Sequence, residues 1–168
     1  MQLMSIVSKK GDRGETWYFD KRVRKDSELM EAVGSLDELQ AVCGLVKLEK
    51  IQKDLYWIMG NLGEKKPVSA PPLRGSDVAR PDSVNSDVAR LETRIREMEK
   101  EIEMMEKKIK VPREFVIFKK EKAVKLNWVR TVVRRAERRI VKLDKDVIIY
   151  LNRLSDFIYL KALQEELK

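Results

Sequence analysis

The sequence contains no histidine, and among its 168 residues it contains a single cysteine, Cys43. Without histidine the chain offers no imidazole ligand for a metal, no Ser-His-Asp or Cys-His nucleophile, and no imidazole acid or base. One cysteine cannot form an internal disulfide, which fits a reducing cytoplasm. The enzymatic chemistry that remains uses positioning and electrostatics, or carboxylates, lysines and a bound cofactor.

The sequence also lacks a long apolar run and a secretory leader. No stretch approaches the roughly 18 consecutive apolar residues of a membrane span, and the first residues lack the apolar core of a signal peptide. We therefore expect a cytoplasmic protein without a membrane partner. The length suits one domain, 1–168, and the apolar share of 43% is ordinary. The charged share of 38% favours a thermophilic source.

The net charge of +8 is concentrated in residues 119–142, which carry ten Lys or Arg against Glu121 and Glu137. Such a segment raises nucleic acid as a partner. However, its only aromatic residue is Trp128, and it contains no nucleic-acid recognition motif or series of stacking residues. Nucleic acid is therefore not the favoured partner, and the charge suits a smaller anion such as ATP equally well.

Five segments carry apolar residues at helical spacing. Proline and glycine interrupt the pattern over 63–85, which is expected to be a flexible loop; the pentapeptide Ser-Asp-Val-Ala-Arg occurs at 76–80 and again at 86–90. Ser27 suits the N-cap of the first helix, Ser86 suits that of the third, and Pro112 ends the third. No strand pair is evident. The pattern predicts an all-α, antiparallel five-helix bundle, with helices over 28–46, 48–62, 88–109, 120–143 and 146–167.

Charged and polar side chains border the apolar stripe of the fourth predicted helix. Arg130, Arg134 and Glu137 share the spacing of that stripe and lie about 100° round the helix from it. In the last predicted helix, Asn152 and Asp156 are one turn apart. Arginine, glutamate and asparagine at one seam could hold a polyphosphate, or they could form ion pairs across a subunit interface.

The N-terminal region, 1–27, is short and predicted to be irregular. Gly11 and Gly14 lie three residues apart among lysines and hydroxyl side chains. A loop of this kind lets backbone N–H groups approach phosphates closely. It lacks the GxxxxGK[ST] spacing of a Walker A loop, and the pattern alone favours an ordinary surface turn.

Four segments, in the same order along the chain, resemble the PduO-type ATP:cob(I)alamin adenosyltransferases. Enzymes of this family transfer the 5′-deoxyadenosyl group of ATP to the cobalt of reduced cobalamin and release triphosphate. The resemblance covers nearly the whole chain apart from the 63–85 loop. The segments are Ser8–Thr16 (TKTGDKGTT in the family), Lys21–Val23 with Glu31–Leu39 (KRV…EAYGTVDEL), Arg130–Arg139 (RTVCRRAERR) and Tyr150–Asp156 (YLNRLSD).

The resemblance implies a five-helix bundle of ferritin-like architecture that forms a homotrimer, with ATP at the subunit interfaces. Lys21 would contact the triphosphate as a cation. Mg²⁺ would be held mainly through the ATP phosphates, with no metal site of the protein's own. The residues that would wrap the triphosphate are Ser8, Lys9, Gly11, Asp12, Arg13 and Gly14.

The resemblance also implies the residues that act in catalysis. Arg134, Glu137 and Asn152 would hold triphosphate and nucleoside, and we expect Arg134 to be buried against phosphate. Arg130 would pair with Asp37 of the adjacent subunit. Phe115 would pack against cobalamin and help to displace its lower axial ligand, although the sequence alone favours a core position for this ring. Cobalt itself is the nucleophile in this chemistry, so no histidine or serine nucleophile is needed.

The chain departs from the family pattern at the rim of the expected site. The family's FILPGG is replaced by residues 115–120 without Pro-Gly-Gly, Asn127 replaces a histidine, and a later Gly-Gly is reduced to Asp20. Glu15 replaces a threonine, and a carboxylate near triphosphate costs binding unless a cation intervenes. Three functions remain open: an adenosyltransferase serving an adenosylcobalamin-dependent client enzyme, a catalytically weak trimeric homologue that binds ATP or a corrinoid, and, more distantly, a basic bundle that binds nucleic acid.

Overall fold

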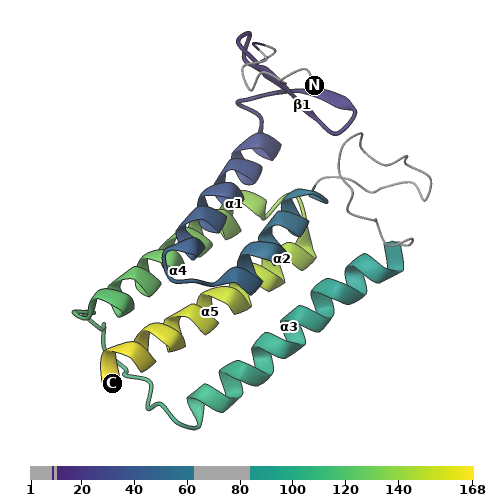
Figure 1. Ribbon diagram of the computed structural model, residues 1–168. Helices are drawn as coiled ribbons and strands as arrows, with labels where there is room; N and C mark the ends of the chain where they lie inside the picture. Colours follow the sequence, from purple (N-terminus) through teal and green to yellow (C-terminus); the bar gives the residue numbers. More distant parts are fainter. Residues whose placement is uncertain (1–8, 10, 63–83) are drawn as a thin grey trace, which may run out of the picture.

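The computed structural model of the protein describes residues 9, 11–62 and 84–168. Within them it contains the predicted helical bundle, drawn in Figure 1. The 63–85 loop lies outside the described residues except for its last two, and so does Ser8. The helices are α1 (Glu28–Gly44), α2 (Glu49–Met59), α3 (Val84–Glu106), α4 (Glu121–Ile140) and α5 (Lys145–Leu167).

Two predicted boundaries of α3 are wrong. The helix begins at Val84, so Ser86 lies inside its first turn and is not its N-cap. It ends at Glu106, before the apolar Ile109 and well before Pro112. Ile109 N still donates to Met105 O at 2.9 Å, which makes the following segment a tight turn that keeps Ile109 buried. The helical spacing of the apolar residues therefore continues beyond the helix itself.

The N-terminal region contains a strand pair where the sequence predicted irregular structure. Strand β1 (Glu15–Tyr18) pairs antiparallel with β2 (Lys21–Arg24), with Tyr18 opposite Lys21. The two-residue turn between them places Phe19 at a positive φ of 54°. Four-residue strands rich in charge give too short an alternation to be recognised, although Thr16, Trp17, Tyr18 and Val23 are good strand formers.

The helices pack around α4 and α5. Helix α4 contacts α1 on one side and α5 on the other, α3 packs against α5, and α2 packs against α1 (Figure 1). The predicted stripe on α4 is confirmed, since Val129, Val133, Ala136 and Ile140 are all completely buried. No helix in the described part of the chain combines the length and apolarity needed to cross a membrane.

Side-chain caps fix where α1 and α5 begin. The predicted cap of α1 is confirmed, because Ser27 Oγ accepts a hydrogen bond from Met30 N at 3.3 Å. Asp144 caps α5 by accepting from Asp146 N at 2.9 Å and Val147 N at 3.1 Å. An N-cap sets the residue at which a helix starts. The turn of α5 that carries Asn152 is therefore fixed in register from its beginning.

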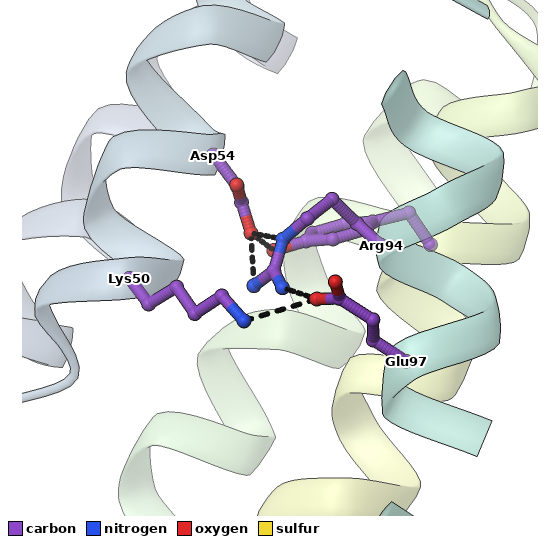
Figure 2. A network of polar contacts seen from close by, with 5 residues as sticks. Lys50, Asp54, Arg94 and Glu97 are labelled. Atoms are coloured by element: carbon purple, nitrogen blue, oxygen red, sulfur yellow. Dashed lines mark hydrogen bonds and ion pairs between the residues drawn. The ribbon is translucent and has the colours of Figure 1, made fainter. Parts of the chain in front are cut away.

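A buried polar cluster joins α2, α3 and α5 (Figure 2). Asp54 is only 5% exposed, and its Oδ2 accepts from Arg94 Nε at 2.9 Å, Arg94 Nη2 at 2.8 Å and Tyr150 Oη at 3.0 Å. At the edge of the cluster, Glu97 pairs with Arg94 and with Lys50, the latter at 2.9 Å. Burial, reinforced by the Asp54 charge, raises the pKa of Tyr150 well above its ordinary value, so the phenol stays a donor.

Candidate functional site

The seam between α4 and α5 brings two predicted site residues together. Asn152 Nδ2 donates to Glu137 Oε1 at 3.3 Å, and both side chains are half-buried. Arg153 Nη1 donates to Asn152 Oδ1 at 2.9 Å, while Arg153 Nε donates to Glu99 Oε1 on α3 at 2.8 Å. The Asn152 amide is thus held at both its oxygen and its nitrogen, in a chain of polar contacts that runs from α4 to α3.

Arg134 lies on α4 one turn before Glu137, but it is exposed and not buried as expected. Arg134 lies about 100° round α4 from the apolar stripe, and in a single chain this face of the helix is open to solvent. In the part of the chain that the structure describes, the Arg134 side chain makes no hydrogen bond or ion pair with another residue. At this seam, Arg134 is therefore free among the described residues to meet an anion, next to a carboxylate that is already engaged.

Other cations at the end of α4 are used in packing against α1. Arg135 pairs with Glu38, Arg139 with Glu31 at 3.8 Å, and Lys142 with Glu28 at 3.1 Å. These contacts join the outer faces of two neighbouring helices. The basic charge of this helix is therefore not a uniform patch, and Arg134 differs from these three cations in having no partner among the described residues.

Arg130 and Asp37 are not brought together within the chain. Arg130 Nε donates to Asn127 Oδ1 at 3.0 Å, and its guanidinium lies 5.6 Å from the centre of the Tyr159 ring on α5. Asp37 is exposed on α1, which packs on α4. The predicted pairing between neighbouring subunits is compatible with this arrangement and stays a prediction. The amide of Asn127, at the position of the family histidine, holds the Arg130 side chain.

The N-terminal loop is described from Lys9 through Gly14 except for residue 10. Asp12 N donates to Lys9 O at 3.4 Å, and Gly14 N donates to Gly11 O at 3.3 Å. Gly14 has φ +78°, a conformation that suits glycine. A Cβ added at Gly11 would lie 2.9 Å from Lys25 Nζ, so the loop packs closely on that side chain. The loop presents exposed residues at Lys9, Asp12 and Arg13.

The hairpin that follows the loop neutralises Glu15. Arg22 donates to Glu15 Oε2 from Nη2 at 3.0 Å and from Nε at 3.2 Å. The carboxylate that replaces a family threonine therefore carries its own counter-cation from the opposite strand. Lys21, the expected triphosphate contact, is exposed at the start of β2. Pairing within the hairpin lowers the electrostatic cost that the sequence predicted for Glu15 near an anion.

Phe115 is fully exposed, so its assignment to the core is wrong. It belongs to the irregular segment between α3 and α4, where Ile117 is also largely exposed. The second half of the segment is fixed: Val116 packs on an apolar cluster that includes Leu160, and Phe118 packs edge-on against Tyr159. Glu166 Oε2 accepts from Lys119 N at 3.0 Å and Lys120 N at 3.1 Å. The carboxylate from α5 thus fixes the backbone directly before α4 and leaves the Phe115 ring in solvent.

Two further features bear on the chemistry. Cys43 is completely buried on α1, and burial raises the pKa of its thiol to about 12, so it does not supply a thiolate nucleophile.

A cleft of about 460 Å³ opens where residues 47–53 face α3, with Arg94 and Phe157 in its lining. None of the predicted site residues that the structure describes lines this cleft. The candidate site is therefore an exposed seam and not a closed pocket.

Comparison with known proteins identifies relatives of this chain. A sequence pattern for cobalamin adenosyltransferase matches residues 6–165. The corrinoid adenosyltransferase PduO of Citrobacter freundii is 31% identical over 97% of this chain and 50% of its own length. The corrinoid adenosyltransferase of Bacillus subtilis is 30% identical over 95% of this chain and 85% of its own. The chain thus spans about half the length of the PduO relatives that it matches.

A solved structure supports the fold independently. A variant PduO-type adenosyltransferase from Lactobacillus reuteri, complexed with ATP, is 25% identical, with a TM-score of 0.73 over 96% of this chain and 94% of that one. The family match spans the N-terminal loop, the α4–α5 seam and the segment of Phe115. With this match over almost its entire length, the chain belongs to the cobalamin adenosyltransferase family.

Proposed function

We propose that the protein transfers the 5′-deoxyadenosyl group of ATP to the cobalt of a reduced corrinoid and releases triphosphate. The observation that carries the proposal is Arg134, exposed and without a partner among the described residues, beside the Glu137–Asn152 pair. An arginine free of carboxylates can form charge-assisted hydrogen bonds to phosphate oxygens. Its polar neighbours leave capacity for hydrogen bonds to the nucleoside.

The reduced corrinoid supplies an electron pair that forms the cobalt–C5′ bond, and the C5′–O bond breaks as triphosphate leaves. The protein's part is to align C5′ with cobalt and to stabilise the charge of the leaving group. Arg134 stabilises that charge from α4. Lys21 from β2 and residues 11–14 of the N-terminal loop contribute as well, with Mg²⁺ held mainly through the phosphates.

The corrinoid is proposed to lie against the exposed ring of Phe115. A fully exposed phenylalanine on an irregular segment offers apolar surface to a ligand at no cost to the core. Its contact with the corrin face would exclude the lower axial ligand of cobalt. The rigid end of the segment, fixed by Glu166 and by the packing of Phe118, gives the ring a defined base.

We infer further that the protein works as a homotrimer, with ATP between subunits and Arg130 paired with Asp37 of a neighbour. Asp37 is exposed, and α4 carries the exposed apolar side chains Val124 and Trp128. Reversing both charges, Arg130→Asp with Asp37→Arg, should keep the trimer in sedimentation equilibrium, whereas either change alone should weaken it. If the wild-type protein is a monomer at micromolar concentration, the proposed trimer is wrong.

The single buried cysteine and high charge fit a cytoplasmic protein of a thermophile that serves a corrinoid-dependent client enzyme.

Incubation with ATP, Mg²⁺ and chemically reduced cobalamin tests the proposed activity. The spectrum should develop into that of light-sensitive adenosylcobalamin only when protein and ATP are both present. The second candidate is a homologue that binds ATP or a corrinoid but transfers slowly. It is favoured by one observation, the loss of Pro-Gly-Gly after Phe115. Tight ATP binding without product would support this second function.

A further inference from the structure

Tyr18 links the N-terminal hairpin to the bundle. Tyr18 Oη donates to Met59 O at 2.6 Å and lies 3.2 Å from Leu62 O. Met59 is the last residue of α2, where a helix leaves its carbonyl groups without partners of its own, and Leu62 lies in the turn that follows. The half-buried phenol therefore caps α2 and at the same time holds β1 against it.

The contact lies where it can set the position of the hairpin. Figure 1 shows the strands projecting beyond the bundle at the start of α1, to which Ser27 connects them. A hairpin joined at one end is free to tilt unless a second point is fixed. Tyr18, at the end of β1 and opposite Lys21 in the strand register, supplies such a point.

Contacts join the hairpin and the glycine loop to each other. Lys25 N donates to Gly14 O at 2.9 Å, and Gly11 packs on the Lys25 side chain. Glu15, the first residue of β1, follows Gly14 directly and is paired with Arg22 on β2. A tilt of the two strands would consequently displace Lys21 and residues 11–14 together.

We propose that Tyr18 is a positioning residue for nucleotide binding, which fixes residues 11–14 and Lys21 in the place where they meet the triphosphate. This inference rests on the proposed function. Without the phenol hydroxyl, the loop spends a smaller fraction of time in the competent position, and the apparent dissociation constant for ATP rises by the inverse of that fraction. Loss of the one hydrogen bond that the phenol O–H donates, which is shared between the two carbonyls, corresponds to a rise of about three- to tenfold.

Tyr18→Phe is the test, because it removes the hydroxyl and keeps the ring. Tyr56→Phe is the matched control, since Tyr56 is exposed on α2 and lies outside the proposed site. Calorimetric titration should show ATP binding about three- to tenfold weaker in Tyr18→Phe and unchanged in the control. The KM for ATP should rise in parallel, whereas kcat at saturating ATP and the KM for reduced cobalamin should stay at wild-type values. A residue that only stabilised the fold would not raise the KM for ATP while leaving kcat and the KM for reduced cobalamin unchanged.

Hydrogen exchange measured by mass spectrometry, without nucleotide, gives a second readout. Peptides covering residues 15–24 should exchange faster in Tyr18→Phe, while those of α4 and α5 should be unchanged. The proposal is overturned if ATP affinity stays within about twofold of wild type or rises, or if the hairpin exchanges at the wild-type rate. If wild type itself binds no ATP, the proposed function fails together with this inference. If wild type and Tyr18→Phe bind ATP equally, only the inference fails.

Discussion

Asn152 on α5 donates a hydrogen bond to Glu137 on α4 at 3.3 Å. Each residue comes from a different family segment, and the contact closes the seam at which Arg134 is exposed without a partner among the described residues. Arg153 extends the contact to Glu99 on α3. This seam of the candidate site is thus held by side chains from three helices.

Arg134→Ala should weaken ATP binding by about 10- to 100-fold, since hydrogen bonds between charged partners contribute about 1.5–3 kcal/mol. The melting temperature should hardly change, because the side chain is exposed and makes no ion pair with the described residues. Titration calorimetry measures the first effect and thermal unfolding the second. Lys142→Ala, just after the end of α4, breaks an exposed pair with Glu28 on α1 and should leave ATP binding intact. Equal losses in both variants would mean that α4 attracts nucleotide only as a diffuse basic surface.

Phe115→Ala should separate corrinoid activation from nucleotide binding. The exposed ring contributes nothing to the core, so thermal stability and ATP affinity should remain near wild type. With ATP present, wild-type protein should shift the Co(II) absorption band to that of a four-coordinate species, and the variant should not. A wild-type protein that binds ATP but gives no such shift would contradict the corrinoid role of Phe115 and favour the binding-only function.

Asp54→Ala should destabilise the fold by about 3 kcal/mol, because it leaves Arg94 partly buried without its main partner. Tyr150→Phe removes one donor from the same carboxylate and should cost about 1 kcal/mol. Urea denaturation measures both free energies of unfolding. Lys50→Ala breaks the exposed pair with Glu97 and should cost less than about 1 kcal/mol. If Asp54→Ala costs no more than this control, the cluster in Figure 2 does not hold α2, α3 and α5 together.

Glu166 gives a pH dependence of known sign. Hydrogen bonds from the backbone N–H groups of Lys120 and Lys119 hold the pKa of its carboxyl below the ordinary value. A carboxyl whose pKa is lower in the folded state stabilises the fold above its unfolded pKa, and this contribution is lost as the pH falls through the folded value. Between pH 6 and about pH 3, Glu166→Gln should therefore lose less stability than wild type. Glu103→Gln, at an exposed position on α3, is the control, and its stability should fall with pH as that of wild type does. If the stability of all three proteins falls in parallel, Glu166 does not stabilise the start of α4.

The features that sequence patterns predicted correctly depend on local periodicity. The stripe of Val129 and Val133 placed α4 correctly, and the spacing of Asn152 and Glu137 in their helices was enough to bring them to one seam. The features that the patterns missed depend on contacts between distant parts of the chain. Nothing near Tyr18 in the sequence indicates that its hydroxyl meets Met59, 41 residues away.

Burial was the property that the sequence predicted least well. Phe115 lies in an apolar run of four residues, but Val116 and Phe118 are the members that pack against the bundle, and Phe115 remains in solvent. Arg134 borders a buried stripe and is nevertheless exposed. Both side chains are accessible where a ligand or a second subunit would cover them. A pattern within one chain does not reveal such a covering surface.

The most direct test of the proposed reaction is to count its two products together. Purified protein, ATP, Mg²⁺ and chemically reduced cobalamin are incubated under anaerobic conditions, and adenosylcobalamin is measured by its light-sensitive spectrum while triphosphate is measured by ion chromatography. Transfer of the 5′-deoxyadenosyl group predicts one triphosphate for each adenosylcobalamin, with both products lost in Arg134→Ala at limiting ATP. ATP that is bound but yields neither product, or that is hydrolysed to diphosphate and phosphate without a change in the corrinoid spectrum, would contradict adenosyl transfer.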